Sequence, residues 1–187
     1  LGVLLTIQVL PGHGDSTLAV LAGRAEEVAR RAEELAHSAW SFAVPDRAGL
    51  VIATIGGEQN EQTWENFGRA LYAASNACEP QGTIILCTDL KCRIGPALSR
   101  LIGHDGESDL LRKLQRDRSE DAASASLLLE TVDRQHVYLL SGLKREVVEG
   151  IGVGFISDAD QIGHLSQNHE SCILLADAHR AGTRVEP

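Results

Sequence analysis

The chain has 187 residues, enough for one large domain or two small ones, and 43% of them are hydrophobic but only 4% aromatic, so its core would be mainly aliphatic. The formal net charge is −9 and the Lys and Arg residues are dispersed, which argues against nucleic-acid binding. The first apolar run is too short to span a bilayer and no secretory signal pattern precedes it, so we expect no membrane association.

Two apolar runs, residues 3–9 and 18–21, flank a segment of turn-forming residues, and this pattern predicts a β-hairpin. Residues 24–43 are then predicted to form a helix, because apolar side chains recur there at helical spacing and charged residues occupy the opposite face.

The next segment predicts one βαβ unit. Residues 50–55 and 83–88 contain almost no polar side chain, as expected for strands that are covered on both faces. Between them, residues 64–78 have helical periodicity, and Thr63 is placed to cap that helix at its N-terminus.

The rest of the chain continues to alternate between helix and strand, and its tail is expected to be irregular. The predicted helices are 96–102, 107–116, 119–134, 144–149 and 159–168, and the predicted strands are 136–141, 153–156 and 172–175. This order implies parallel pairing with right-handed crossovers. The expected fold class is α/β: a Rossmann-like three-layer α/β/α sandwich with a mostly parallel sheet and an N-terminal β-hairpin at one edge.

The four cysteines form no CxxC pair. Cys78, Cys87 and Cys172 lie within apolar stretches, so buried free thiols are their expected state. Free thiols fit a reducing compartment, and we expect a cytoplasmic protein.

Gly56 and Gly57 follow the first strand of the βαβ unit, at the edge where open α/β sheets bind ligands. In a functional interpretation, the backbone approaches a ligand closely here and its amides bind an anion. The alternative is a tight turn between strand and loop, and one glycine pair does not decide between the two.

Glu65, Asn66 and Arg69 share a polar stripe near the start of the following helix, and a guanidinium suits a carboxylate or phosphate. The alternative is that Arg69 only pairs with Glu65 one turn earlier. Helix rules alone favour this simpler interpretation.

His179 and Asp89 follow predicted strands and would lie at the same edge. His179 could relay protons, although a surface histidine is the simpler expectation, and Asp89 could hold a substrate or start a turn. No HxxxH spacing typical of zinc sites occurs. The motifs GxGxxG, GxxxxGK[ST] and GxSxG are also absent, so ordinary dinucleotide binding, P-loop chemistry and serine hydrolysis lack support.

Several segments, in order along the chain, resemble the nickel-dependent lactate racemase family, whose members use a nickel-pincer nucleotide. The resemblance is to the C-terminal domain of such a protein and covers most of the chain. The matching segments are the hairpin end LAGR, the strand–glycine–helix stretch VIATIGGEQNEQTWENFGRAL, and then EPQGTIIL, HVYLLS and DAHRAGT.

In that family the helix after the glycine pair carries the pattern Tyr-Gln-x-x-Lys, whose Gln and Lys reach substrate and cofactor. The matching residues here are Glu65, Asn66 and Arg69, so an amide and a cation remain, although Arg is not equivalent to Lys. An aromatic residue of the family falls on Ala123. These departures suggest a relative that acts on another 2-hydroxy acid, or a diverged site.

The resemblance implies that a hydride leaves C2 of a hydroxy acid for the cofactor and returns on either face, while histidines exchange the hydroxyl proton. The family's catalytic histidines, cofactor-tethering lysine and nickel-ligating histidine belong to an N-terminal domain that this chain does not contain. Residues 1–187 are therefore expected to be a single C-terminal domain, inactive alone and without a catalytic residue or metal ligand. Its part of the cleft wall would consist of Gly56, Gly57, Glu65, Asn66 and Arg69.

The chain begins at Leu1 without a methionine, and its first residues already have the pattern of a strand interior with no lead-in, so we expect a piece of a longer protein. Its expected partners are the N-terminal catalytic domain of the same protein and a small 2-hydroxy acid. The alternative hypothesis is a stand-alone Rossmann-like module that binds a small anion and catalyses nothing.

Overall fold

The structure of the chain, a computed structural model, describes residues 5–14, 16–103 and 109–186. Three predictions fall partly outside these ranges. They concern Leu1, residues 3 and 4 of the predicted strand 3–9, and residues 107 and 108 of the predicted helix 107–116. The chain divides into two compact units, Leu1–Phe42 and Ala43–Pro187, and each is described by itself.

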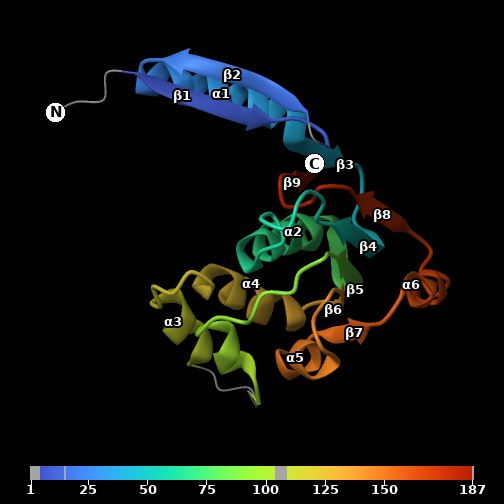
Figure 1. Cartoon of the computed structure of the whole chain (residues 1–187). Helices are drawn as coiled ribbons and strands as arrows, with labels where there is room; N and C mark the ends of the chain where they lie inside the picture. Colours follow the sequence, from blue (N-terminus) through green and yellow to red (C-terminus); the bar gives the residue numbers. More distant parts are fainter. Residues whose placement is uncertain (1–4, 15, 104–108, 187) are drawn as a thin grey trace. The chain divides into compact units, whose positions relative to one another are not determined.

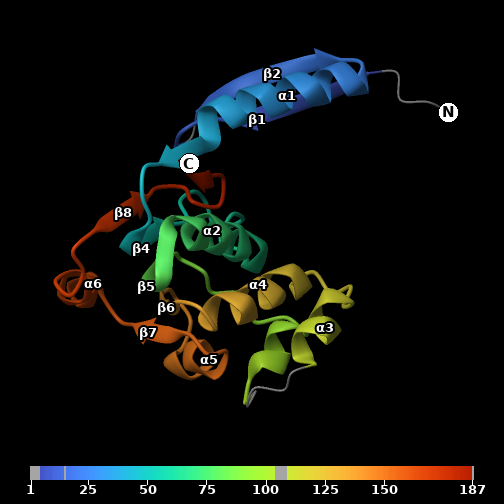
Figure 2. The ribbon, with the colours of Figure 1, turned by 180° about the vertical axis from the view of Figure 1, so that it is seen from behind.

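The first unit consists of a hairpin and one helix. Strands β1 (Thr6–Pro11) and β2 (Thr17–Gly23) pair antiparallel, and α1 (Ala25–Trp40) lies along one face of the pair (Figures 1 and 2). The buried hydrophobic residues of this unit are Leu10, Val28, Ala32 and Trp40. The predicted hairpin and helix are confirmed.

The second unit contains a five-stranded parallel sheet of order β7-β6-β5-β4-β8. Its strands are β4 (Ala48–Thr54), β5 (Cys78–Cys87), β6 (His136–Leu140), β7 (Gly154–Ile156) and β8 (Cys172–Leu175). Its helices are α2 (Trp64–Ala77), the 3-10 helix η1 (Leu98–Leu101), α3 (Leu110–Gln115), α4 (Ala122–Val132), α5 (Arg145–Gly150) and α6 (Ala159–Ser166). The predicted elements of this region are present, with shifted ends.

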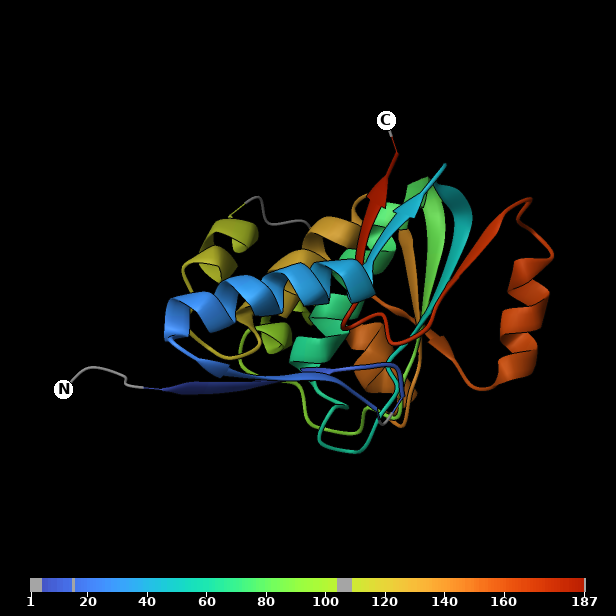
Figure 3. The same ribbon diagram turned by 90° about the horizontal axis from the view of Figure 1, so that it is seen from above.

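Helices cover both faces of the sheet, as the edge-on view of the sheet in Figure 3 shows: α2 and α4 lie on one side and α6 on the other. Val51 and Ala53 of β4 point into the larger core under α2 and α4. Leu50 and Ile52 point into the smaller cluster under α6. Side chains on both faces of β4 are therefore covered, which is why the strand is uniformly apolar. The predicted α/β class with its three layers is confirmed.

Helix α2 begins as its sequence predicts. The side chain of Thr63 accepts a hydrogen bond of 3.1 Å from the backbone N–H of Asn66, so Thr63 is the N-cap. At Gly68 the helix touches α4 so closely that a Cβ would collide with the side chain of Ser124. Ser124 in turn donates a 2.8 Å hydrogen bond to the carbonyl of Trp64, which fixes α4 against α2.

Two short strands were not predicted. The segment after α1 forms β3 (Ser41–Val44), which pairs with β9 (Gly182–Val185), so the expectation of an irregular tail is wrong. The backbone N–H of Glu186 donates to the carbonyl of Val44 at 2.9 Å. Neither segment is a continuous apolar run like that of β8, and the predicted helix 24–43 includes the first three residues of β3.

The predicted location of the hairpin needs correction. Its two strands hydrogen-bond to each other as a separate sheet in the first unit and do not extend an edge of the parallel sheet. The expectation for Cys172 also fails: β8 is an edge strand, and the Cys172 side chain is exposed. Cys78 is buried and Cys87 half-buried, and all four cysteines are free.

Candidate functional site

The topology of the parallel sheet selects one crevice as the place for a ligand. From β4 the chain proceeds through β5, β6 and β7 in one direction, and β8 is then added on the opposite side of β4. Ligands of open α/β sheets bind outside the carboxyl ends of the strands where the direction of strand addition reverses. Here that point lies between the loop after β4, residues 55–63, and the loop after β8, residues 176–181.

Gly56 and Gly57 lie at this point, but side chains of the chain itself approach them. Gly57 has φ +89°, a conformation that favours glycine, and a Cβ there would lie 2.8 Å from Oε2 of Glu61. A Cβ on Gly56 would collide with the carboxylate of Asp177. The two glycines therefore allow carboxylates to sit against the backbone, which agrees with the tight-turn interpretation.

A cluster of charged side chains joins the two loops. Glu61 accepts hydrogen bonds from Nη2 of Arg180 at 2.8 Å to each carboxylate oxygen, and its Oε2 lies 3.0 Å from Nε2 of His179. Burial raises the pKa of the Glu61 carboxyl, but the hydrogen bonds and charges of Arg180 and His179 outweigh it, and the net pKa lies below the ordinary glutamate value. Glu61 is therefore ionised at neutral pH.

His179 is buried, so the expectation of a surface histidine is wrong. Its side chain is only 3% exposed, and its Nδ1 atom is buried without a hydrogen-bond partner among the described residues. Because ionised Glu61 can only accept, Nε2 is the donor of this contact, and Nδ1 is the ring nitrogen left without a partner among the described residues. A buried polar atom without a partner costs about 1–3 kcal/mol and is uncommon in folded proteins.

Gln62 fixes the geometry of the same edge. Its side-chain Nε2 donates to the carbonyls of Gly56 at 3.1 Å and Ile55 at 3.3 Å, and its Oε1 accepts from the hydroxyl of Thr88 at 2.6 Å. The backbone N–H of Asp89 also donates to Oε1, at 3.1 Å. The buried amide thus ties the end of β4 to the end of β5 and fixes the backbone at Asp89.

The three polar residues of α2 do not act together. Nη2 of Arg69 lies 2.6 Å from Oε1 of Glu65, and both side chains are well exposed, as the simpler interpretation of the sequence has it. Asn66 points elsewhere, because its Nδ2 donates to the carbonyl of Glu61 at 2.8 Å. Asn66 therefore holds the loop that carries Glu61.

One cavity still brings several predicted residues together. It has a volume of about 390 Å³, and its wall comes from α2, α4 and the loop after β8. The lining residues are Glu65, Gly68, Arg69, Tyr72, Glu120, Ala123, Ser124, Leu127, His179 and Ala181. Arg69 and His179, 110 positions apart in sequence, thus share one cavity with Ala123, whereas the glycine pair and Asn66 are not part of its wall.

Two other cavities lie near this region. One of about 1000 Å³ is lined by residues such as Trp64, Cys92 and Glu120, and one of about 430 Å³ lies at the carboxyl ends of β5 and β6, beside Thr88 and Asp89. Asp89 therefore lines a cavity at the carboxyl edge of the sheet.

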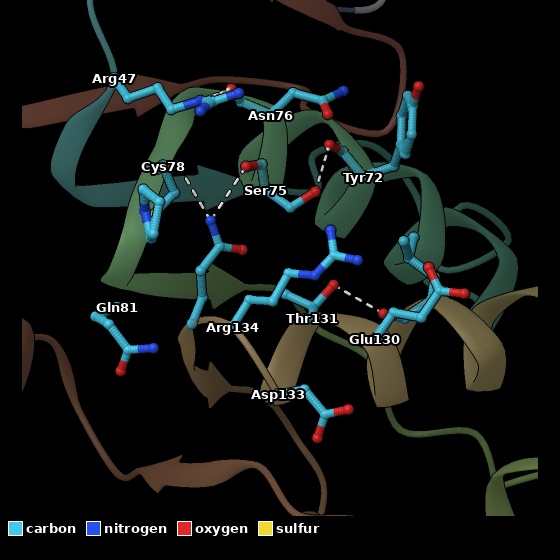
Figure 4. A pocket seen from close by; sticks show the side chains of 13 residues that line it. Arg47, Tyr72, Ser75, Asn76, Cys78, Gln81, Glu130, Thr131, Asp133 and Arg134 are labelled. Atoms are coloured by element: carbon cyan, nitrogen blue, oxygen red, sulfur yellow. Dashed lines mark hydrogen bonds between the residues drawn. The ribbon is translucent and has the colours of Figure 1, made fainter. Parts of the chain in front are cut away.

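A further cavity, of about 370 Å³, lies away from the switch point, at the C-terminal end of α2 and the start of β5 (Figure 4). There Nε2 of Gln135 donates to the carbonyls of Ser75 at 3.2 Å and Cys78 at 3.1 Å. Nε of Arg47 donates to the carbonyl of Asn76 at 3.3 Å. These bonds satisfy carbonyls that the end of a helix leaves open, so the polar groups here have a structural role.

Across the described ranges, no group of three or more His, Cys, Asp or Glu side chains is arranged to hold a metal ion. In the same ranges every helix is too short or too polar to cross a lipid bilayer.

Two solved structures share this fold. The lactate racemase apoprotein from Thermoanaerobacterium thermosaccharolyticum superposes with a TM-score of 0.76 at 17% sequence identity, over 98% of this chain and 46% of that one. A protein from Thermotoga maritima superposes with a TM-score of 0.67 at 12% identity, over 97% of this chain and 49% of that one. The chain therefore spans about half the length of either structure, and the resemblance inferred from sequence is confirmed for the fold. No protein-family model and no curated protein matches the sequence.

Proposed function

We propose that this chain is the C-terminal domain of a 2-hydroxy-acid racemase-like enzyme and forms one wall of a cleft for substrate and a nickel-pincer nucleotide. The observation that carries the proposal is the shared fold, which takes in 98% of this chain but only 46% of the lactate racemase chain. The catalytic half would then be a separate N-terminal domain of the same protein. Free cysteines fit the cytoplasmic location that we propose with it.

Arg69 is the residue of this wall that we assign to the substrate. Arg69 lines the 390 Å³ cavity and its side chain is well exposed, so we assume that the guanidinium turns from Glu65 to the carboxylate of a hydroxy acid. The exchange costs little, because an exposed ion pair contributes only about 0.2–1 kcal/mol. Asn66 then acts as a positioning residue, since its amide is bonded to the loop that carries Glu61.

The cofactor fits this chain only in part. A nickel-pincer nucleotide, when bound, supplies the hydride acceptor for C2 of the substrate. Arg69 offers a cation for its acidic groups, whereas the described part of this chain has no cluster of side chains suited to the metal. We assign the metal ligands and the covalent tether to the other domain, as the family resemblance implies.

The experiment uses the longest natural protein that contains this chain, produced together with enzymes that make the nickel-pincer nucleotide. Each enantiomer of lactate and of larger 2-hydroxy acids is incubated with it, and the products are separated by chiral chromatography. Interconversion of one of these acids and co-purifying nickel are the expected result. A well-folded, nickel-loaded protein that interconverts none of them contradicts the proposal.

A second function, the stand-alone binding of a small anion, has one observation in its favour. The cavity with Arg69 and His179 is built entirely by residues of the second unit, so no other domain is needed to form it. Calorimetric titration of the 187-residue chain with lactate, phosphate and sulfate tests this function. Binding that the change Arg69→Ala leaves unaltered would refute it.

A further inference from the structure

The hairpin of the first unit carries apolar side chains on both of its faces. Leu10 lies on the face that α1 covers and is buried. On the opposite face, Ile7 is 66%, Val9 60% and Val20 63% exposed. Val9 pairs directly with Val20 across the two strands, so these side chains adjoin one another. Leu18, two residues before Val20 on β2 and 41% exposed, extends the patch. We call this patch of Ile7, Val9, Leu18 and Val20 the open hairpin face.

This pattern is typical of a sheet that is covered on both sides. A hairpin with one face in water alternates apolar with polar residues, as antiparallel sheets commonly do. Here the other side chains on the open hairpin face, Pro11 and Ala22, are also uncharged, and no Lys, Asp or Glu protects it among the described positions of β1 and β2. Contiguous exposed apolar surface of this kind marks an interaction site.

The opposite side of the unit has the character of a protein surface. Most outward residues of α1 are charged, and some form ion pairs: Nη1 of Arg30 lies 2.6 Å from Oε1 of Glu34, and both side chains are well exposed. Two strands and one helix also bury too little apolar area to be stable alone, since units this small need a further layer. The first unit therefore has one polar, solvent-exposed side, formed by α1, and one apolar side, the open hairpin face, that no further layer covers within the described part of the unit.

We propose that the open hairpin face docks onto an apolar layer supplied by the part of the racemase-like protein that lies outside this chain. The inference rests on the proposed function, because that function supplies the occupant: the racemase with the same fold is more than twice as long as the segment that this chain matches. The occupant is apolar because the face offers aliphatic contact and no charge. The hairpin and α1 thus cover part of the neighbouring domain's core.

The test compares the reactivity of two introduced cysteines in the longest natural protein that contains this chain. Val20→Cys places a thiol on the open hairpin face, and Ala29→Cys places one on the exposed side of α1 in the same unit. Both proteins are treated with a maleimide, and the labelling rate of each peptide is followed by mass spectrometry. If the face is covered, Cys at position 20 reacts more than about tenfold more slowly than Cys at position 29, since it must wait for local opening. Equal rates would overturn the proposal.

A cross-linker attached at position 20 then identifies the occupant. Cross-links to peptides outside residues 1–187 support the proposal, whereas cross-links to residues 43–187 or to a second copy overturn it. Val9→Cys repeats the measurement at the paired position, in case one substitution disturbs folding. Racemisation is assayed on the same samples. A protected face without racemisation refutes only the proposed function, and racemisation with a freely reactive face refutes only the docking.

Discussion

Nε2 of His179 lies 3.0 Å from Oε2 of Glu61, and this contact joins the two loops of the topological switch point across 118 positions of sequence. Because Arg180 also binds Glu61, the carboxylate stays charged and the histidine ring is held in one orientation. The same ring lines the cavity that contains Arg69. Glu61 is therefore linked to the cavity wall through His179, and we expect a substitution of Glu61 to change the position of His179 in that wall.

Removal of the charge of Glu61 tests whether its contacts with His179 and Arg180 stabilise the two loops. We expect Glu61→Gln to lower the free energy of unfolding by about 1–3 kcal/mol, because hydrogen bonds to a charged group are lost in a partly buried site. Glu58→Gln in the same loop is the control, since Glu58 is exposed and should change stability by less than about 0.5 kcal/mol. Urea denaturation of both variants gives the two values, and equal values would show that the cluster does not stabilise the loops.

The effect of Glu61→Gln should depend on pH. The pKa of Glu61 is lowered in the folded state, so its contribution to stability is present above the pKa of the unfolded state and is lost as the pH falls through the folded pKa. The difference in unfolding free energy between the natural chain and Glu61→Gln should therefore be largest near neutral pH and shrink on acidification. A difference that grows as the pH falls would contradict the lowered pKa of Glu61 in the folded state.

Two glycines of helices offer a matched pair of substitutions. A methyl group at Gly68 collides with Ser124 of α4, so Gly68→Ala should destabilise the fold by about 1–3 kcal/mol. A Cβ at Gly163 in α6 meets nothing within 4 Å, so Gly163→Ala should stabilise it by about 0.5–1 kcal/mol. Thermal melts of the two variants should shift in opposite directions. A shared direction would contradict the close contact of α2 with α4.

The fold could be predicted because its signals are local. The capping hydroxyl of Thr63, the helical spacing in α2 and the uniformly apolar β4 each identify an element within a few residues, and the order of elements then implies the parallel sheet. The strands β3 and β9 were missed, since their sequences SFAV and GTRV mix polar with apolar residues and give no apolar run like that of β8. The exposure of Cys172 depends on which strand lies at the edge, and helix spacing does not determine that.

The site was predicted less well, because its contacts join distant residues. Nothing in the sequence near Glu61 indicates that Arg180 and His179 will bind it. A histidine beside an arginine in a loop is expected to lie exposed on the surface. Gln62 gave no signal either, since a buried amide is recognised only once its five partners are in place. By contrast, the pairing of Glu65 with Arg69 follows from helix geometry alone.

The thiols should differ strongly in reactivity. Burial raises the pKa of Cys78 to about 12, whereas the Cys92 side chain is exposed. With iodoacetamide at pH 8, Cys92 should be modified first and Cys78 last, and all four cysteines should react at similar rates in urea. Peptide mass spectrometry over time gives the order. Early modification of Cys78 in the native protein would mean that β5 opens or that its first residue is not buried.

The role proposed for Arg69 gives the last prediction. Because its ion pair with Glu65 is exposed, Arg69→Ala should change the free energy of unfolding by less than about 1 kcal/mol. In the racemase-like protein, however, the loss of a charged hydrogen bond to the substrate carboxylate should lower kcat/KM roughly 10- to 100-fold. Arg69→Lys retains the charge without the planar fork, so it should recover part of the loss. Arg30→Ala, which breaks a similar exposed pair on α1, serves as the control and should leave kcat/KM unchanged. If Arg69→Ala behaves like this control, the guanidinium does not reach the substrate, and its contact with Glu65 is its whole role.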